Sequence, residues 1–216
     1  QKIDFEKQKK DYEYQVLQSQ INPHFLFNTI NTIASLIRTD PETARKLLRE
    51  FAVFYRRTLE DSADLIVFAR EMEQTKRYFT FEVARFGADR VEMEMRIDPR
   101  VEDMLVPPFL LQPLVENAVR HAMPSEGKLT IEVTGEVTGN DVIVRVCDNG
   151  VGMTEEARCN ILHPESSLGL GIAVKNVHDR ICGYFGPGTH MEVESELGKG
   201  TCVILVLKEG ALREYQ

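Results

Sequence analysis

The sequence has no run of about 20 apolar residues, the length that a helix needs to span a bilayer, and no secretory signal peptide. It also lacks low-complexity tracts and internal repeats, which argues against a disordered or repetitive protein. Basic residues are outnumbered, and the net charge of −8 argues against a chain whose main task is to grip nucleic-acid phosphates. With 216 residues, 43% of them hydrophobic, we expect one large or two small globular domains.

Cysteine is scarce, and no two cysteines form a C-x-x-C pair. The four are Cys147, Cys159, Cys182 and Cys202. Three of them lie in apolar periodic stretches, which makes a metal site or a disulfide framework a poor interpretation. We therefore predict buried, reduced thiols in a reducing compartment.

The chain begins with Gln1 rather than Met, and helical sequence starts at once. Phe5, Tyr12 and Val16 are spaced seven and four residues apart among charged neighbours, as on an amphipathic or coiled-coil helix. We therefore expect a piece of a longer protein, in which any membrane segment lies upstream.

Helical periodicity continues to about residue 87. One helix is expected around residues 26–37, and a second begins after Asp40-Pro41, an N-cap followed by proline at the first helical position. A third covers about Ala69 to Phe86 and ends at Gly87. The apolar faces that we predict are Leu26, Ile30, Ile33 and Ile37 in the first helix; Ala44, Leu48, Phe51, Tyr55 and Leu59 in the second; and Met72, Phe79, Val83 and Phe86 in the third.

Beyond this point the apolar period changes to that of strands. Residues 91–97 alternate between apolar and charged, and Pro107-Pro108 precedes a helix expected over about 109–123. The other expected elements are strands at 129–133, 142–146, 191–195 and 201–207 and a helix at 171–185. Helices and mostly antiparallel strands in this order predict an α+β fold with a two-layer sandwich. We place two domains at residues 1–88 and 89–216.

Polar residues share one side of the helix in L-L-Q-P-L-V-E-N-A-V-R-H-A, residues 110–122. Its leucines face a core, whereas Glu116, Asn117, Arg120 and His121 lie on the rest of the surface. An asparagine offers a neutral oxygen to Mg²⁺, and an arginine offers paired donors to phosphate. Taken alone, such a face is solvated in most proteins.

Two glycine-bearing segments follow. In V-C-D-N-G-V-G-M, residues 146–153, Asp148 ends a buried strand and needs a partner such as the amino group of adenine. Gly150 and Gly152 allow close approach of the backbone or a positive φ, although a tight turn would look the same. In S-L-G-L-G-I-A-V-K-N-V, residues 167–177, Gly169 and Gly171 open a helix whose N–H groups suit phosphate oxygens. The G-x-x-x-x-G-K-[ST] phosphate loop is absent from the sequence.

Together with a final strand that begins at Gly200-Thr201, these segments occur in the order found in the GHKL (Bergerat-fold) family, which they resemble. The resemblance implies that the domain binds ATP, with Mg²⁺ near Asn117 and the adenine held by Asp148 with support from Thr201. It also implies that residues 153–168 form a lid, and that the two glycines of the third segment lie near the phosphates.

The first domain contains Q-S-Q-I-N-P-H-F-L-F-N-T-I-N, residues 18–31. His24, Asn28, Asn31 and Ser35 are spaced four, three and four residues apart and form a polar stripe. An exposed, neutral imidazole on a rigid helix suits in-line attack on a γ-phosphoryl group. A lone surface histidine usually has no such role, so the residues that flank His24 determine whether it can be interpreted as a phosphoacceptor.

With those flanking residues the chain resembles the LytS-type sensor histidine kinases, over about residues 15–208. The resemblance includes A-R-F-G at 84–87 and V-P-P-F-L-L-Q-P-L-V-E-N-A at 106–118. It implies autophosphorylation on His24 with ATP and Mg²⁺, followed by transfer to an aspartate of a response regulator. It also implies a homodimer in the cytoplasm, attached to the membrane through an upstream segment and without direct contact to nucleic acid.

Two departures from related families bear on mechanism. Pro113 stands where GHKL proteins that hydrolyse ATP often carry Glu, which favours transfer to His24 over hydrolysis. Phe25 stands where many histidine kinases carry an acidic residue, so the sequence does not identify the general base that takes the proton of His24. Glu116 is our candidate for this base. Asn28 is expected to orient either the imidazole ring of His24 or the water that dephosphorylates the regulator. The alternatives are a simple ATPase and a nucleotide-gated interaction module in which His24 is structural.

Overall fold

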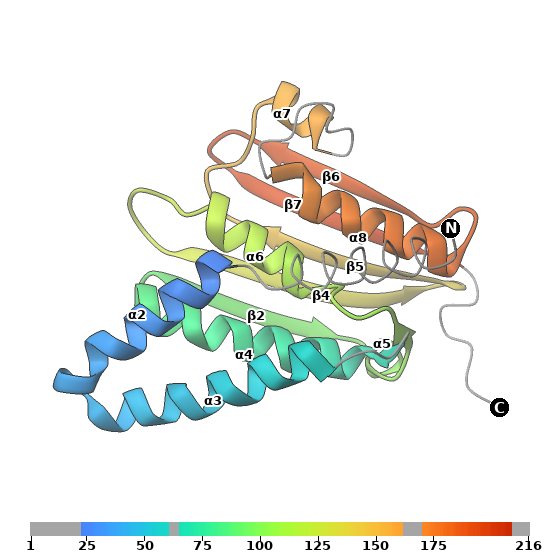
Figure 1. Ribbon diagram of the computed structural model, residues 1–216. Helices are drawn as coiled ribbons and strands as arrows, with labels where there is room; N and C mark the ends of the chain where they lie inside the picture. The colour runs from blue at the N-terminus through green and yellow to red at the C-terminus, as the bar shows by residue number, and fades with distance from the viewer. Residues whose placement is uncertain (1–22, 61–64, 162–169, 209–216) are drawn as a thin grey trace, which may run out of the picture. The chain divides into compact units, whose positions relative to one another are not determined.

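The computed structural model describes residues 23–60, 65–161 and 170–208 (Figure 1). By its contacts the chain divides into two compact units, residues 1–62 and 63–216. The predicted entry helix around Phe5, Tyr12 and Val16 lies outside the described residues. In the described part of the chain, no helix has both the length and the apolar character that crossing a membrane requires.

The first unit is a helical hairpin of α2 (Pro23–Thr39) and α3 (Pro41–Glu60). Asp40 caps α3 as predicted, because its carboxylate accepts a hydrogen bond from the backbone N–H of Thr43 at 3.1 Å. Hydrogen bonds from Thr43, first that of its side chain and then that of its backbone N–H, hold the pKa of Asp40 below its usual value. Phe25 and Phe54 meet edge to face across the hairpin, with ring centroids 5.5 Å apart.

The apolar faces of this hairpin differ in part from the prediction. The residues buried in α2 are Phe25, Thr29 and Ile33, and those in α3 are Ala44, Leu47, Phe54 and Thr58. Ile30, Ile37 and Leu48 were expected to be buried, but they are 48%, 59% and 57% exposed. Both helices carry apolar residues on more than one face, and periodicity does not tell which face the neighbouring helix covers.

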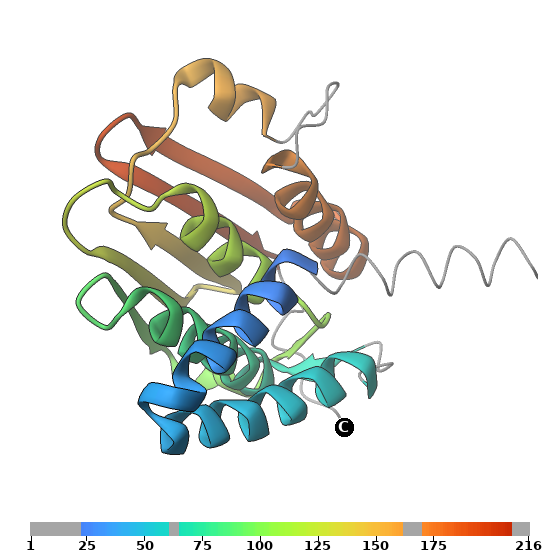
Figure 2. The same ribbon diagram turned by 60° about the vertical axis from the view of Figure 1, so that its left-hand side comes forward.

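The second unit contains a five-stranded sheet in the order β2-β4-β5-β7-β6. The strands are β2 (Val91–Ile97), β4 (Leu129–Thr138), β5 (Asp141–Asp148), β6 (His190–Glu196) and β7 (Gly200–Leu207). Only the β2–β4 pair is parallel among these, so the predicted mostly antiparallel, α+β architecture is confirmed. One face of the sheet is covered by α4 (Phe68–Phe86), α6 (Gln112–His121) and α8 (Leu170–Phe185) (Figures 1 and 2).

Short elements connect this framework. They are β1 (Ile66–Val67), α5 (Pro99–Glu102), β3 (Leu105–Val106) and α7 (Glu155–Asn160). The two short strands pair with each other, antiparallel. None of the four elements was predicted, because each is too short to show a period.

Helix α4 belongs to the second compact unit, whereas we expected the domains to meet near residue 88. It contacts α6, β2, β1 and α5, and Gly87 ends it with a φ of 96°, as predicted. Helical periodicity shows that α4 is a helix, but it does not show on which unit the helix packs.

Helix α6 begins at Gln112, three residues later than the prediction near residue 109. The residues before it form an irregular loop, 107–111, in which Phe109 has a φ of 60°. Phe109 is the one non-glycine residue with a positive φ in the described part of the chain. This backbone conformation is costly for a residue with a side chain, so other contacts must hold the loop.

The cysteine prediction is wrong for one pair. Cys147 of β5 and Cys202 of β7 lie opposite each other in the strand register and form a disulfide. The free cysteines are Cys159, which is exposed, and Cys182, which is half-buried. The pairing could not be predicted because 55 residues separate the two cysteines, and only the strand order makes them neighbours.

Candidate functional site

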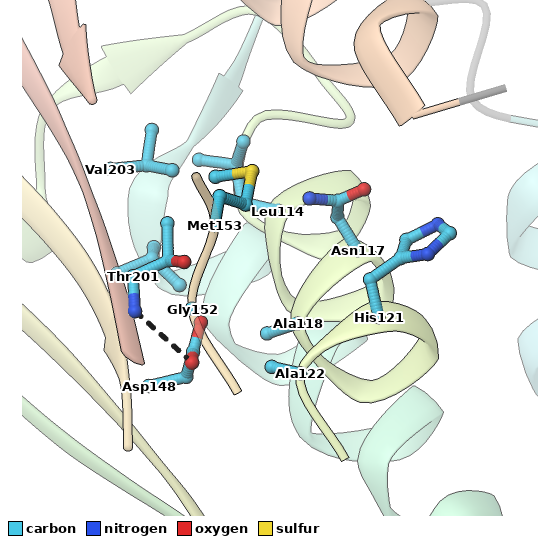
Figure 3. A pocket seen from close by; sticks show the side chains of 11 residues that line it. Leu114, Asn117, Ala118, His121, Ala122, Asp148, Gly152, Met153, Thr201 and Val203 are labelled. Atoms are coloured by element: carbon cyan, nitrogen blue, oxygen red, sulfur yellow. Dashed lines mark hydrogen bonds between the residues drawn. The ribbon is translucent and has the colours of Figure 1, made fainter. Parts of the chain in front are cut away.

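A pocket lies in the second unit between α6 and the ends of β5 and β7 (Figure 3). The space between its walls, open solvent included, is about 430 Å³. The sheet wall and the helix wall are both largely apolar, with a few polar groups between them. The lining residues are Leu114, Asn117, Ala118, His121, Ala122, Val146, Asp148, Gly152, Met153, Thr201 and Val203.

Asp148 is the acidic residue of the pocket wall. Its Oδ1 accepts hydrogen bonds from the backbone N–H groups of Gly150 at 2.9 Å and Thr201 at 3.2 Å. Burial raises the pKa of the Asp148 carboxyl, and the two amide donors oppose this effect. Among the described residues Oδ2 accepts no hydrogen bond, so it is the oxygen available to a donor in the pocket.

The other two residues of D-N-G hold the surrounding backbone. The side chain of Asn149 forms hydrogen bonds with Thr130 of β4 and with Lys128, the residue before β4. Oδ1 of Asn149 accepts from the N–H of Thr130 at 2.7 Å, and Nδ2 of Asn149 donates to the carbonyl of Lys128 at 3.1 Å. Gly150 lies against the C-terminal end of α6, where the N–H of Val151 donates to the carbonyl of Ala122 at 3.1 Å. The close approach predicted for Gly150 is therefore an approach to α6, the helix wall of the pocket.

Replacing Gly150 with Ala should destabilise the second unit. A Cβ at this position would lie 2.0 Å from the carbonyl oxygen of Ala122, which is backbone and has little freedom to move. We expect a loss of about 1–3 kcal/mol in the free energy of unfolding, measured by urea denaturation. Gly183→Ala is the matched control, because nothing lies within 4 Å of its Cβ. In helix α8 that change should stabilise by about 0.5–1 kcal/mol, and equal effects of the two substitutions would contradict the steric explanation.

Ser195 of β6 supports the pocket and was not predicted from the sequence. Its Oγ lies 2.8 Å from Oγ1 of Thr201, donates to the carbonyl of Gly200 at 3.1 Å, and accepts from the N–H of Met153 at 2.8 Å. It thereby joins the start of β7 to the segment after Gly152. The only signal in the sequence was its place opposite Thr201 in a strand pair, and this register was unknown.

Helix α6 places Asn117 and His121 at the pocket, one turn apart, as the sequence predicted for a polar face. Leu114, Ala118 and Ala122 form the apolar part of the same wall (Figure 3). Burial, with a further contribution from the charge of Arg120, lowers the pKa of His121. The lowered pKa favours the neutral imidazole, which suits a hydrogen bond better than an ion pair.

Two predicted residues of α6 do not line the pocket. Arg120 is exposed, and Oε1 of Glu116 accepts a hydrogen bond from Nε2 of Gln112 at 2.9 Å. Glu116 lies on a helix that contacts α4, and burial, followed by the charges of Glu82 and Glu116, raises the pKa of Tyr78 on α4. The role of Glu116 as a general base stays a prediction.

The glycine-rich segment and the lid are described only in part. Gly171 lies in the first turn of α8, whereas Gly169 and residues 162–168 lie outside the described residues. At the start of the expected lid, Gly152 has a φ of 64° and Met153 lines the pocket. Thr154 caps α7, because its Oγ1 accepts from the N–H of Ala157 at 3.3 Å.

His24 lies in the first turn of α2, in the helical unit, and it is exposed. Its Nδ1 is 3.0 Å from Nδ2 of Asn28, one turn later on the same helix. Asn31 and Ser35 are exposed on the same helix. The predicted polar stripe therefore exists, and it includes a contact between the imidazole and Asn28.

In comparisons with known proteins, two stretches of this chain match two protein families. Residues 12–91 match the family described as histidine kinase, and residues 109–211 match the family described as histidine kinase-, DNA gyrase B-, and HSP90-like ATPase. The sensor protein LytS of Bacillus cereus is 40% identical over 96% of this chain and 36% of its own length. The sensor histidine kinase/phosphatase LytS of Staphylococcus aureus is 37% identical over 86% of this chain and 32% of its own length.

Solved structures agree on the fold. The catalytic domain of histidine kinase ThkA superposes with a TM-score of 0.52 at 18% identity, covering 67% of this chain and 94% of that domain. The histidine kinase domain of the blue-light activated kinase of Erythrobacter litoralis gives a TM-score of 0.50 at 15% identity, covering 93% of each chain. The fold around the pocket is thus that of a histidine kinase catalytic domain.

The chain belongs to the LytS-type sensor histidine kinases, which confirms the resemblance seen in the sequence. It spans about a third of the length of the curated relatives that it matches.

Proposed function

We propose that this chain binds ATP in the pocket of its second unit and transfers the γ-phosphoryl group to His24. The observation that carries the proposal is Asp148, a carboxylate whose Oδ1 is held by two backbone amides while it lines a largely apolar pocket. The other carboxylate oxygen, Oδ2, can accept a hydrogen bond from the amino group of adenine, and the apolar walls of the pocket can pack against the adenine ring. Membership of a histidine kinase family supports the same assignment.

The phosphates and Mg²⁺ would lie toward Asn117 and the start of α8. The amide of Asn117 is a neutral oxygen ligand at the pocket wall, which fits Mg²⁺. The described residues contain no group of three His, Cys, Asp or Glu that could hold a metal, and Mg²⁺ in nucleotide sites takes most of its ligands from phosphate and water. Its chemical contribution would be to neutralise charge on the phosphates, with Gly169, Gly171 and Arg120 as further proposed contacts.

In the transfer step a ring nitrogen of His24 attacks the γ-phosphorus in line. The N–P bond forms as the bond to the β-phosphate oxygen breaks, ADP leaves, and the ring proton passes to a base. The attacking nitrogen needs a free lone pair, so the other ring nitrogen must carry the proton. As placed, Nδ2 of Asn28 donates to Nδ1, which leaves the ring proton on Nε2; turning the Asn28 amide by 180° would bring its oxygen to Nδ1–H and leave the lone pair on Nε2.

Asn28→Ala should therefore slow autophosphorylation. The substitution removes the side chain 3.0 Å from Nδ1 of His24 and with it this contact to the ring. We expect a decrease of about 10- to 100-fold in the rate of label incorporation, with little change in ATP affinity. Asn31→Ala on the same exposed helix is the control and should behave like the native protein. If Asn28→Ala left both autophosphorylation and dephosphorylation of the regulator intact, the proposed role would be lost.

The proposed partners are a second copy of the chain and the receiver domain of a response regulator. The helical hairpin exposes Phe27, Ile30, Ile37 and Leu48, which supports association with another apolar helical surface. In the whole protein the chain would lie in the cytoplasm, attached to the membrane through an upstream segment and without direct contact to nucleic acid.

The proposal is tested with the native protein, γ-labelled ATP and Mg²⁺. Acid-labile, base-stable phosphate on the protein is expected for a histidine kinase. Free phosphate without labelled protein would instead indicate a simple ATPase, although Pro113 stands where ATP-hydrolysing relatives often carry Glu. ATP binding with neither product would indicate a nucleotide-gated interaction module.

A further inference from the structure

The loop that leads into α6 is fastened by a carboxylate from another helix. Glu71, in the first turn of α4, is 3% exposed. Its Oε1 accepts from the N–H of Phe109 at 2.7 Å, and its Oε2 accepts from those of Leu110 at 2.8 Å and Leu111 at 3.0 Å. Three consecutive backbone amides thus converge on one buried carboxylate.

A cation from a third helix holds the carbonyl side of the same loop. Nη1 of Arg180, on α8, donates to the carbonyls of Pro108 at 2.5 Å and Phe109 at 3.1 Å. Burial raises the pKa of Glu71, while the three amides and the charge of Arg180 oppose this effect. The loop therefore has its donors bound by α4 and its acceptors bound by α8.

This arrangement explains the unusual backbone of Phe109. A non-glycine residue with a φ of 60° persists only where its surroundings determine the conformation. Here the N–H and the carbonyl of Phe109 are both bonded, to Glu71 and Arg180 respectively. Leu110 and Leu111 are fully buried directly after it, so the loop has little freedom to relax in another way.

The loop at 107–111 positions α6, the helix wall of the pocket. Leu111 is the last residue before α6, and the first turn of α6 bonds back to its carbonyl. Leu114, Asn117 and His121 follow on that helix and line the pocket. A shift of the loop would therefore move the groups proposed to meet Mg²⁺ and the nucleotide.

We propose that Glu71 and Arg180 are positioning residues for the nucleotide site, which they serve by fixing the loop at 107–111 and hence the start of α6. The inference rests on the proposed binding of ATP, but its geometric part can be tested without a ligand. Neither residue lines the pocket, so neither is expected to touch the nucleotide.

The test compares Glu71→Gln with Glu73→Gln, the same substitution two residues later on α4. In Glu71→Gln the new side-chain amide would turn a donor toward at least one of the three backbone donors. Glu73 is half exposed and forms an ion pair with Arg77 at 2.7 Å, so losing the charge of Glu73 should change the affinity for ATP little. We expect Glu71→Gln to weaken binding of ATP with Mg²⁺ about tenfold by calorimetry, with Glu73→Gln within about twofold of the native protein.

Amide NMR supplies a measurement that general destabilisation would not reproduce. In Glu71→Gln the amide protons of Phe109, Leu110 and Leu111 should shift upfield and lose protection from exchange, and the resonances of Asn117 and His121 should move. The strand amides of β5 and β7 should remain as in the native protein. Unchanged α6 resonances together with native ATP affinity would overturn the proposal.

Arg180→Gln provides a second route if Glu71→Gln does not fold, since Arg180 is only partly buried. It should shift the same α6 resonances and weaken ATP binding. In the double variant the two effects on affinity should be less than multiplicative, because both act through one loop. Fully multiplicative effects would overturn the shared mechanism. If the native protein itself does not bind ATP, the proposed function fails, whereas the α6 resonances still decide whether Glu71 positions that helix.

Discussion

His24→Gln is expected to abolish autophosphorylation. An amide side chain has no basic nitrogen lone pair, so it offers no nucleophile to the γ-phosphorus. His24 is exposed, and it is not among the residues that line the pocket. The substitution should therefore leave the stability within about 0.5 kcal/mol and the ATP affinity within about twofold of the native values. The measurement is acid-labile label on the protein after incubation with γ-labelled ATP and Mg²⁺.

The matched control is His190→Gln, which changes another surface histidine on β6. His190 is 45% exposed, bonds to Glu192 at 2.9 Å, and does not line the pocket. It should label at the native rate. Label that survives in His24→Gln would mean that the acceptor lies elsewhere in the chain. Loss of label together with loss of ATP binding would mean that the substitution acts on the nucleotide site, and mass spectrometry of the labelled native protein would then identify the acceptor.

The residues whose place in the fold was predicted correctly were found through local signals. Asp148 stands at the end of an apolar run, so a buried strand ending in a carboxylate could be predicted from the sequence alone. Asn117 and His121 are four residues apart in an amphipathic pattern, which places them on one helix face. Asp40-Pro41 and Gly87 gave the ends of two helices through their backbone preferences.

What could not be predicted depends on contacts between distant segments. Ser195 reaches Met153 and Thr201 because β6 pairs with β7 in one register, and a shift by one residue would turn its side chain to the other face. Cys147 meets Cys202 for the same reason. Glu71 looks in the sequence like any charged residue near the start of a helix, and only the loop 38 residues later gives it a buried partner.

Asp148→Asn is expected to weaken ATP binding about 100-fold while leaving the fold intact. In the native protein Oδ1 accepts from the amides of Gly150 and Thr201, and asparagine keeps this oxygen. The substitution exchanges only Oδ2 for an NH₂ group, which then faces the amino group of adenine, donor against donor. The measurement is calorimetric titration of native and variant protein with ATP and Mg²⁺, together with thermal unfolding of each without nucleotide.

Thermal unfolding separates a local effect from a folding defect. Burial raises the pKa of Asp148 in the folded protein, so the folded state binds this proton more tightly than the unfolded state does. The stability that Asp148 contributes is therefore greater at low pH and falls as the pH rises from 3.8, its ordinary value, through the raised folded value. At neutral pH the ionised carboxylate costs stability, so a neutral asparagine should unfold at the same or a slightly higher temperature. A clear decrease in unfolding temperature would assign the loss of affinity to the fold.

Inosine triphosphate makes the recognition of the base itself testable, because it carries a carbonyl oxygen where ATP carries the amino group. The native carboxylate should repel this oxygen and discriminate strongly in favour of ATP. The NH₂ group that Asp148→Asn introduces should instead donate to the oxygen, so the ratio of ATP affinity to inosine triphosphate affinity should fall by more than the loss of ATP binding alone. If the ratio stayed at its native value, Asp148 would support the pocket without contacting the base. The preference for one nucleotide over the other depends on which hydrogen-bonding group is left unpaired in the pocket. Exchanging Oδ2 of Asp148 for an NH₂ group is therefore enough to reverse the preference for ATP over inosine triphosphate.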